Sequence, residues 1–154
     1  MNLQDLDPVY KPLIEARILI LSQDQASVFK PPENSVLIRI SDPYKFFKTL
    51  SGSWQHVCKA KFYDVTSLHL SAIMAGYVVP TEKDLRPIFE FLTLHKDKFV
   101  VVHCAAGISR SAAVAKVYAE YIGRQDISEY ISSCGIFDPN SEVVYLLREM
   151  WGLL

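Results

Sequence analysis

The residues with the clearest chemical potential are Cys104 and Arg110, which stand six positions apart in the segment HCAAGISRS, residues 103–111. An apolar run, VVV at 100–102, precedes this segment and an alanine-rich stretch follows it, so a strand, a loop and a helix N-terminus are expected in that order. Unpaired backbone N–H groups and the positive end of the helix dipole converge at such a junction. Residues 104–110, named here the anion loop, therefore predict an anion-binding site with a thiol at its start.

The surroundings of Cys104 favour a reactive thiolate. Loop N–H groups and the charge of Arg110 can lower a cysteine pKa from about 8.5 into the range of roughly 3.5 to 7.5. The planar guanidinium of Arg110 can hold two oxygens of a phosphate, and Gly107 permits a turn with its N–H inward. Ser111 can donate a hydrogen bond to the sulfur when it leaves. The alternative is an ordinary buried cysteine at a strand end.

The string HCAAGISRS resembles the signature loop of the cysteine-dependent protein tyrosine phosphatases, and its AGxSRS portion is most similar to the dual-specificity branch. The likeness extends more loosely over residues 17–123, and the tail FDPNSE is similar to small bacterial and phage phosphatases. The resemblance implies that Cys104 attacks a phosphomonoester to give a cysteinyl-phosphate, which water hydrolyses. It implies a role for His103 in tuning the thiolate rather than as a base. The oxygens of the phosphate would be held by Ala105, Ala106, Gly107, Ile108, Ser109 and Arg110.

This chemistry also needs a general acid on a separate loop, because the leaving oxygen must be protonated. The resemblance implies an aspartate a few tens of residues before the nucleophile, and Asp64 in KFYDV stands 40 positions before Cys104. Asp42 in a turn and Asp84 at a helix start are weaker alternatives. Asp138 precedes a proline and is expected to be a helix N-cap.

The remaining cysteines and histidines are assigned to packing or to the surface. Cys58 and Cys134 are expected to be small buried apolar groups, with a protective disulfide to Cys104 as the alternative. Three further histidines have no ligand spacing: His56, His69 and His95.

Strand and helix patterns alternate along the chain. Apolar, β-branched runs predict strands at 17–22, 35–41, 56–65 (or only the second half of that run) and 98–103. Helices are predicted from Asp84, over 108–122 with Gly123 just beyond, near 127–133, and from Asp138 to Met150. This order predicts an α/β fold with a mostly parallel central sheet of about four to five strands flanked by helices, although an antiparallel edge strand is an alternative.

Length and composition fit one catalytic domain over residues 1–154, since 50% of the residues are hydrophobic and 21% are charged. The net charge of −1 and the lack of a dense basic run predict neither a nucleic-acid nor a membrane partner. The N-terminus has no secretory pattern, and no apolar run reaches the roughly 18 residues of a membrane span, so a cytoplasmic location is expected. Three cysteines at unrelated spacings predict no metal and no cofactor.

The expected substrate is a phosphorylated protein, carrying phosphotyrosine with or without phosphoserine and phosphothreonine, or a small phosphomonoester. The interior of the anion loop, AAGIS, adds no basic residue, which disfavours phosphoinositides. Four apolar side chains within 66–80 form either a pocket rim or part of the core: Leu68, Leu70, Met74 and Tyr77. Two other functions are considered, a non-catalytic phosphate- or phosphoprotein-binding module without an effective acid and a sulfur-transfer or arsenate-reducing enzyme.

Overall fold

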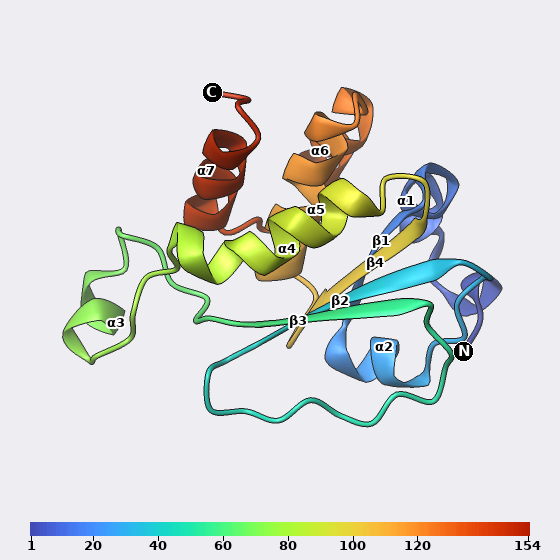
Figure 1. Cartoon of the computed structure of the whole chain (residues 1–154), viewed down its shortest axis with the longest axis horizontal. Coiled ribbons are helices and arrows are strands. Elements are labelled where there is room, and N and C mark those ends of the chain that lie inside the picture. Colours follow the sequence, from blue (N-terminus) through green and yellow to red (C-terminus); the bar gives the residue numbers. More distant parts are fainter.

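The computed structural model describes residues 1–154 and builds them around a four-stranded sheet (Figure 1). The strands are β1 (Ile18–Ser22), β2 (Ser35–Ser41), β3 (His56–Lys61) and β4 (Phe99–Cys104). All three strand pairs are parallel and the spatial order is β1-β4-β2-β3, so the predicted α/β fold with a parallel central sheet is confirmed. The strand that ends in Cys104 is internal. Ligands of open parallel sheets bind beyond the carboxyl ends of the strands, which is where this cysteine lies.

Seven helices surround the sheet. They are α1 (Lys11–Ala16), α2 (Gln23–Val28), α3 (Leu70–Met74), α4 (Glu82–Leu94), α5 (Arg110–Tyr121), α6 (Gln125–Ser133) and α7 (Ser141–Met150), preceded by two short 3₁₀ turns, Leu3–Asp5 and Pro8–Tyr10. Figure 1 shows α4 to α7 gathered on one side of the sheet and α2 on the other. None of these helices has the length and apolarity that crossing a membrane requires. β2 and β4 are buried along their whole length and their apolar residues belong to one hydrophobic cluster of 35 residues, so the anion loop starts from a fully buried strand.

The run predicted as a strand at 56–65 is a strand only in its first half, and the alternative that favoured its second half is wrong. β3 is an edge strand, in which buried Cys58 and Ala60 alternate with exposed residues that include Lys59 and Lys61. Its apolar signal is weak for that reason, because only one face is covered. The more apolar second half leaves the sheet and carries Asp64 towards the end of β4.

The start of α4 differs from the prediction. Its N-cap is Thr81, and Asp84 lies in the first turn, where its carboxylate accepts a hydrogen bond from the Thr81 N–H at 2.9 Å. Pro87 consequently lies inside the helix rather than in its first turn. The proline removes the hydrogen bond to the carbonyl of Lys83, which is an exposed residue, so water can replace the lost donor.

The start of α7 also differs, because Asn140 rather than Asp138 is its N-cap. The Asn140 Oδ1 atom accepts hydrogen bonds from the N–H groups of Glu142 and Val143 at 2.9 and 3.0 Å. An asparagine that caps two N–H groups satisfies the helix start two residues later than predicted. Asp138 is left free of the helix.

The predicted end of α5 is confirmed. Gly123 has φ +83°, and the N–H groups of Gly123 and Arg124 donate to the carbonyls of Glu120 and Ala119. This pattern is a Schellman motif, which closes a helix with a glycine in the left-handed conformation. The helix starts at Arg110, so the residues between Cys104 and that arginine form an open turn.

Candidate active site

The anion loop directs its backbone N–H groups inward. Four of its carbonyl groups are bonded outside the loop: Cys104 to the His103 ring, Ala105 to the N–H of Gln23, Ile108 to the N–H of Asp138, and Ser109 to the N–H of Asn140. Because a trans peptide is planar, an outward carbonyl places the next N–H on the opposite side. No N–H group of residues 105–110 donates to a backbone carbonyl. The loop therefore presents a ring of N–H donors that no backbone carbonyl uses, of the kind that binds an oxyanion.

Gly107 allows this loop to pass close against β1. Its φ is +69°, and a Cβ atom at this position would lie 2.6 Å from the backbone carbon of Leu21 and 2.6 Å from the nitrogen of Ser22. Side-chain carbons do not approach backbone so closely, and L-residues rarely adopt this φ. The position needs glycine for both reasons.

We expect Gly107→Ala to destabilise the fold and to weaken phosphate binding. The left-handed backbone and the clash together should lower the free energy of unfolding by about 2–4 kcal/mol, and phosphate affinity should fall about tenfold or more because the N–H groups shift. Gly123→Ala is the matched control, since φ there is +83° but nothing lies within 4 Å of the added carbon. Urea denaturation and calorimetric phosphate titration measure both effects; equal losses in the two variants would contradict a special role for Gly107.

The Cys104 thiol is buried at the mouth of this ring of donors. Its Sγ lies 3.1 Å from Ser111 Oγ. Burial alone would raise the pKa of the Cys104 thiol, but hydrogen bonds from Ser111 and from the Gly107 backbone, together with the charge of Arg110, outweigh it and lower the pKa. By contrast, burial raises the pKa of Cys58 to about 11. Of the two buried thiols, Cys104 is thus the one whose pKa is lowered.

The guanidinium of Arg110 is anchored through Nη1, and its Nε and Nη2 donors have no partner in the chain. Its Nη1 donates to Asp42 Oδ1 at 2.8 Å and to the carbonyl of Phe62 at 2.7 Å. Its Nε is buried and has no hydrogen-bond partner. Asp42 therefore orients the guanidinium rather than lining the cavity, and the orphan Nε is the donor that an oxyanion above Cys104 would satisfy.

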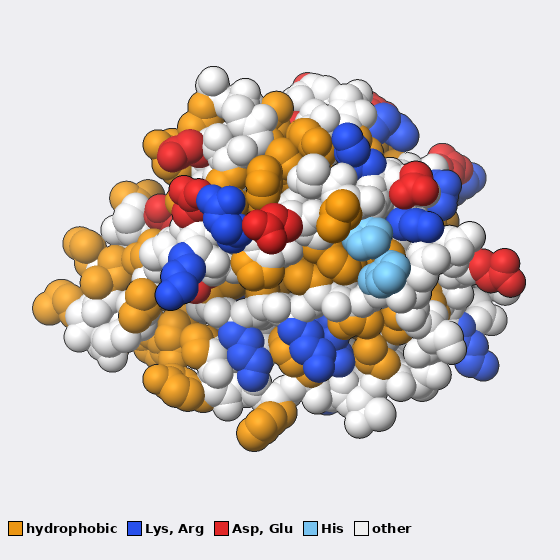
Figure 2. Space-filling view, in the orientation of Figure 1, with side chains coloured by type: hydrophobic (Ala, Val, Ile, Leu, Met, Phe, Trp, Pro, Cys, Tyr) orange, Lys and Arg blue, Asp and Glu red, His pale blue; other side chains and the backbone are white.

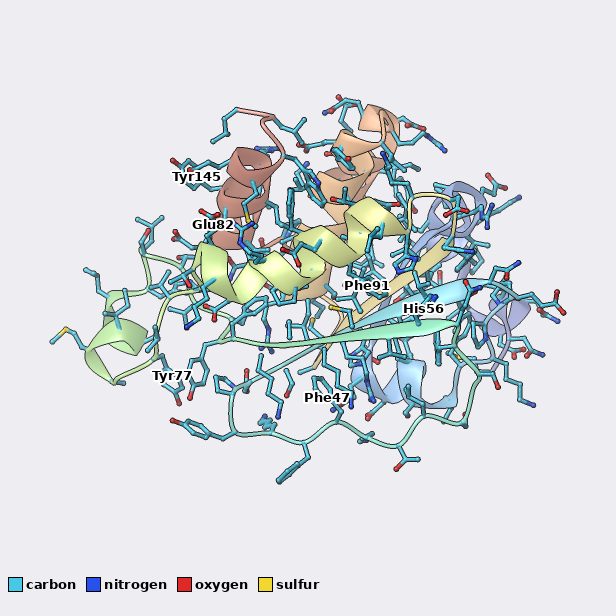
Figure 3. The ribbon with its side chains drawn as sticks, viewed as in Figure 1. Phe47, His56, Tyr77, Glu82, Phe91 and Tyr145 are labelled. Carbon is cyan, nitrogen blue, oxygen red and sulfur yellow. The ribbon has the colours of Figure 1, made fainter.

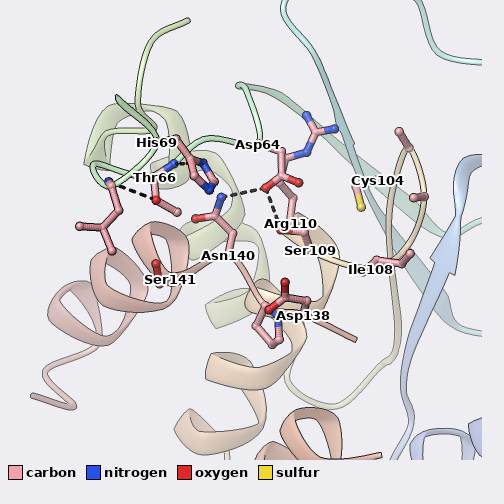
Figure 4. Close-up of a pocket in the computed structure, with 14 residues that line it drawn as sticks. Asp64, Thr66, His69, Cys104, Ile108, Ser109, Arg110, Asp138, Asn140 and Ser141 are labelled. Atoms are coloured by element: carbon pink, nitrogen blue, oxygen red, sulfur yellow. Dashed lines mark hydrogen bonds between the residues drawn. The ribbon is translucent and has the colours of Figure 1, made fainter. Parts of the chain in front are cut away.

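The anion loop forms one wall of a cavity of about 610 Å³ (Figure 4). Two carboxylates, Asp64 and Asp138, share its lining with Cys104, whereas Asp84 does not reach it. Asp64 Oδ1 accepts hydrogen bonds from Ser109 Oγ at 2.7 Å and from Asn140 Nδ2 at 2.8 Å, and Figure 4 draws both. The structure thus brings the expected acid to the expected nucleophile, and adds a second carboxylate that the sequence assigned to a helix cap.

No family model matches the chain, and no curated protein matches it. Solved structures do match. A human tyrosine phosphatase-like serine/threonine/tyrosine-interacting protein aligns with a TM-score of 0.53 and 19% identity, over 90% of this chain and 93% of its own. A mouse putative dual specificity phosphatase, complexed with zinc tungstate, aligns with a TM-score of 0.58 and 12% identity, over 89% of this chain and 83% of its own. Human DUSP28 aligns with a TM-score of 0.54 and 14% identity, over 88% of both chains. The chain has the dual-specificity phosphatase fold.

Within this phosphatase fold, Asn140 is a cavity residue that sequence reasoning missed. It is buried, its Oδ1 caps α7, and its Nδ2 bonds to Asp64 and to the carbonyl of Val65 at 3.3 Å. Its side-chain donors and acceptor are therefore all engaged. The only sequence signal was the capping preference of asparagine, which predicts a helix start and says nothing of a cavity.

The segment between Asp64 and α4 shapes the cavity mouth of the phosphatase fold. His69, expected at the surface or in packing, lines the cavity, and its Nδ1 accepts a hydrogen bond from the N–H of Thr66 at 3.1 Å. The core-packing alternative for the apolar residues of this segment is wrong, because all four are exposed: Leu68 83%, Leu70 69%, Met74 88% and Tyr77 47%. Of these four only Leu68 lines the cavity; Tyr77, labelled in Figure 3, packs edge-on against Tyr63.

The other candidate titratable residues of the phosphatase fold lie outside the cavity. His56 and His95 stack with ring centroids 4.8 Å apart and form the pale blue patch of Figure 2. Cys58 is buried as expected, whereas Cys134 is only partly buried. All three cysteines are free, so the disulfide alternative gains no support.

Proposed function

We propose that the chain is a phosphomonoester hydrolase, a protein tyrosine or dual-specificity phosphatase that works through a cysteinyl-phosphate. The observation that carries the proposal is the buried, unpartnered Nε of Arg110 beside a thiol whose pKa is lowered. Together with the free N–H groups of the anion loop, this arrangement suits the three equatorial oxygens of a phosphoryl group in transfer. The fold found in the comparisons is consistent with it.

In the first step, the Cys104 thiolate attacks phosphorus in line, the sulfur–phosphorus bond forms and the ester oxygen–phosphorus bond breaks. The leaving oxygen takes a proton from Asp64 Oδ2, since Oδ1 is occupied by its two donors. The anion loop and Arg110 hold the charge on the phosphoryl oxygens throughout, without reorganising.

In the second step, water attacks the phosphorus of the cysteinyl-phosphate and gives a proton to the Asp64 carboxylate. The sulfur–phosphorus bond breaks, inorganic phosphate forms and Cys104 leaves as a thiolate. The Ser111 hydroxyl, 3.1 Å from the sulfur, stabilises that thiolate as it departs. The charges that this cycle needs are supplied by the chain itself, so no metal or cofactor is part of the proposal.

Hydrolysis of p-nitrophenyl phosphate by the purified protein, with EDTA present, tests the proposed function. We expect steady turnover, and release of phosphate from a phosphotyrosine peptide. Phosphate binding without turnover of either substrate would refute the enzyme and favour a binding module.

We expect Asp64→Asn to reduce kcat by about 10²–10³-fold, because the amide keeps the contact with Ser109 but has no proton to transfer. In this variant the basic limb of the pH profile of kcat should also disappear, since that limb reports deprotonation of the general acid. Asp138→Asn is the matched control, a second carboxylate of the same cavity, and should retain most activity. If the Asp138 variant loses the basic limb instead, the acid is misassigned.

We further propose that the substrate carries a single phosphate, on a protein or a small molecule. Arg110 is the one arginine or lysine among the residues that line the cavity, and Asp64 and Asp138 add two carboxylates. A second phosphate would meet like charge and no cation.

We also propose that residues 1–154 form one catalytic domain, supported by the single hydrophobic cluster. We propose that the protein works in the cytoplasm, where its free thiols stay reduced.

A non-catalytic phosphoprotein-binding module is the second candidate. One observation favours it: Asp64 is tied by Ser109 and Asn140, so its freedom to approach a leaving group is restricted. One of the structural neighbours is likewise named as a phosphatase-like interacting protein. Such a module would bind a phosphotyrosine peptide at least as tightly after Asp64→Asn as before, because a negative charge beside the phosphate is removed, and would release no phosphate.

A further inference from the structure

Arg39, on the internal strand β2, is a buried cation that the catalytic steps leave unexplained. Arg39 is only 4% exposed, and its neighbours in the strand, Ile38 and Ile40, are buried apolar residues. None of the ion pairs of the chain includes it. A buried charge without a counter-ion is costly unless its N–H groups are bonded, so its presence in this strand calls for a physical reason.

Arg39 donates a hydrogen bond to the histidine that directly precedes the anion loop. Arg39 is the register partner of His103 across the β2–β4 pair, and its Nε donates to His103 Nε2 at 2.9 Å. Its Nη2 donates to the carbonyl of Lys48 at 2.7 Å. The ring of Phe47, labelled in Figure 3, lies 4.8 Å from the guanidinium carbon and meets the His103 ring edge-on. The imidazole is thus enclosed by groups that fix its plane.

The arginine also fixes which nitrogen of His103 carries the proton. Arginine has donors and no acceptor, so Nε2 must accept and the proton must sit on Nδ1, which lies 3.2 Å from the carbonyl oxygen of Cys104. Burial, which is the largest effect, and the charge of Arg39 together lower the pKa of His103 to about 4, although the hydrogen bond to Cys104 acts in the opposite direction. His103 is therefore neutral and in one tautomer at neutral pH.

We propose that Arg39 is a positioning residue of the anion loop, which acts through His103 on the first peptide of the loop. Holding the Cys104 carbonyl towards His103 directs the N–H of Ala105 to the other side of the planar peptide, into the loop. Without Arg39, the imidazole can move its proton to Nε2 and the Cys104 carbonyl loses its donor. The anion loop then holds both its thiolate and its oxyanion less well. The inference rests on the proposed function, since it concerns the same site, but its tests do not need turnover.

The first test is ¹⁵N NMR of the histidine side chains in the wild-type protein. We expect His103 to show the Nδ1–H tautomer and no titration between pH 6 and 9. An Nε2–H tautomer, or a titration near pH 6.5, would overturn the proposal. This measurement needs no variant, so it stands even if a substitution at Arg39 prevents folding.

The second test is Arg39→Met, which keeps an unbranched side chain as far as the position of Nε and removes the donors and the charge. We expect the midpoint of the pH dependence of Cys104 alkylation by iodoacetamide, followed by peptide mass spectrometry, to rise by about one unit, and the Kd for inorganic phosphate to increase about tenfold. Arg86→Met, at an exposed arginine of α4, is the matched control and should change neither. A folded Arg39→Met protein with the wild-type alkylation profile and phosphate Kd would overturn the proposal.

A double variant separates positioning from general support of the fold. If Arg39 acts through His103, Arg39→Met should add no further shift in a His103→Gln background; independent, additive shifts would overturn the proposal. The other charged groups around Cys104 are unchanged in all these variants: Arg110 from α5, Asp42 behind it, and Asp64 and Asp138 across the cavity. Failure of the wild type to hydrolyse aryl phosphates would refute the proposed function and leave these binding and alkylation readouts decisive for Arg39.

Discussion

Cys104→Ser should abolish hydrolysis of aryl phosphates and phosphotyrosine peptides while leaving phosphate binding intact. The substitution replaces a thiol of lowered pKa by a hydroxyl that does not ionise at neutral pH, so the attacking anion is lost. Removal of the nucleophile from an enzyme that forms a covalent intermediate costs about 10⁴–10⁶-fold in kcat. The N–H groups of the anion loop and Arg110 are untouched, and they supply the affinity for the anion.

The measurement that separates these effects pairs steady-state kinetics with calorimetric titration of phosphate. We expect the phosphate Kd of Cys104→Ser to equal that of the wild type or to be lower, because a negative charge near the anion has been removed. Cys134→Ser is the matched control, at a partly buried cysteine just after the last residue of α6 and outside the cavity, and should keep full activity. Turnover that persists in Cys104→Ser would rule out the proposed nucleophile.

The parts of the fold that could be predicted are those whose signals lie within a short stretch of sequence. Val100–Val102 are apolar at consecutive positions, and β4 is covered on both faces as that pattern requires. Gly123 marks the end of α5 because a left-handed residue closes a helix by local hydrogen bonds. The anion loop is likewise a local object, built from one strand end and one helix start.

The parts of the site that could not be predicted depend on partners far away in the chain. Arg39 meets His103 across 64 positions, Asp42 meets Arg110 across 68, and Asn140 meets Asp64 across 76. In the sequence, Arg39 is explained as a polar residue in a strand, Asp42 as a turn aspartate and Asn140 as a helix cap. None of these local explanations points to the site. Only the pairing of β2 with β4 and the packing of α5 and α7 in the folded chain give these residues a second function.

The exchange of Asp138 for Asn140 at the start of α7 shows how tertiary contacts decide between two acceptable local choices. Both residues are good N-caps, and they stand two positions apart. The N–H of Asp138 donates to the carbonyl of Ile108 at 2.9 Å, and the N–H of Asn140 donates to that of Ser109 at 3.1 Å. This segment therefore closes against the anion loop before the helix begins, which leaves the Asp138 carboxylate at the cavity.

Arg110→Lys should be severely impaired although the charge is kept. The guanidinium of Arg110 is anchored through Nη1 to Asp42 and to the carbonyl of Phe62, while Nε and Nη2 are left for the substrate. A lysine has one ammonium group, which cannot pair with Asp42 and also hold two phosphate oxygens in one plane. We expect kcat to fall about 10²–10³-fold, as for loss of a donor to the transition state, and the phosphate Kd to rise.

Asp42→Asn is the companion variant that tests the anchoring part of this argument. The amide oxygen can still accept from Nη1, but it does not carry the charge that holds the guanidinium in place, so we expect a smaller loss of about tenfold in kcat/KM. If the guanidinium does two tasks, Arg110→Lys must lose much more than Asp42→Asn. Wild-type kinetics in Arg110→Lys would show that a point charge is sufficient, and equal losses in both variants would show that the ion pair with Asp42, rather than the planar contact with phosphate, is the main contribution of Arg110.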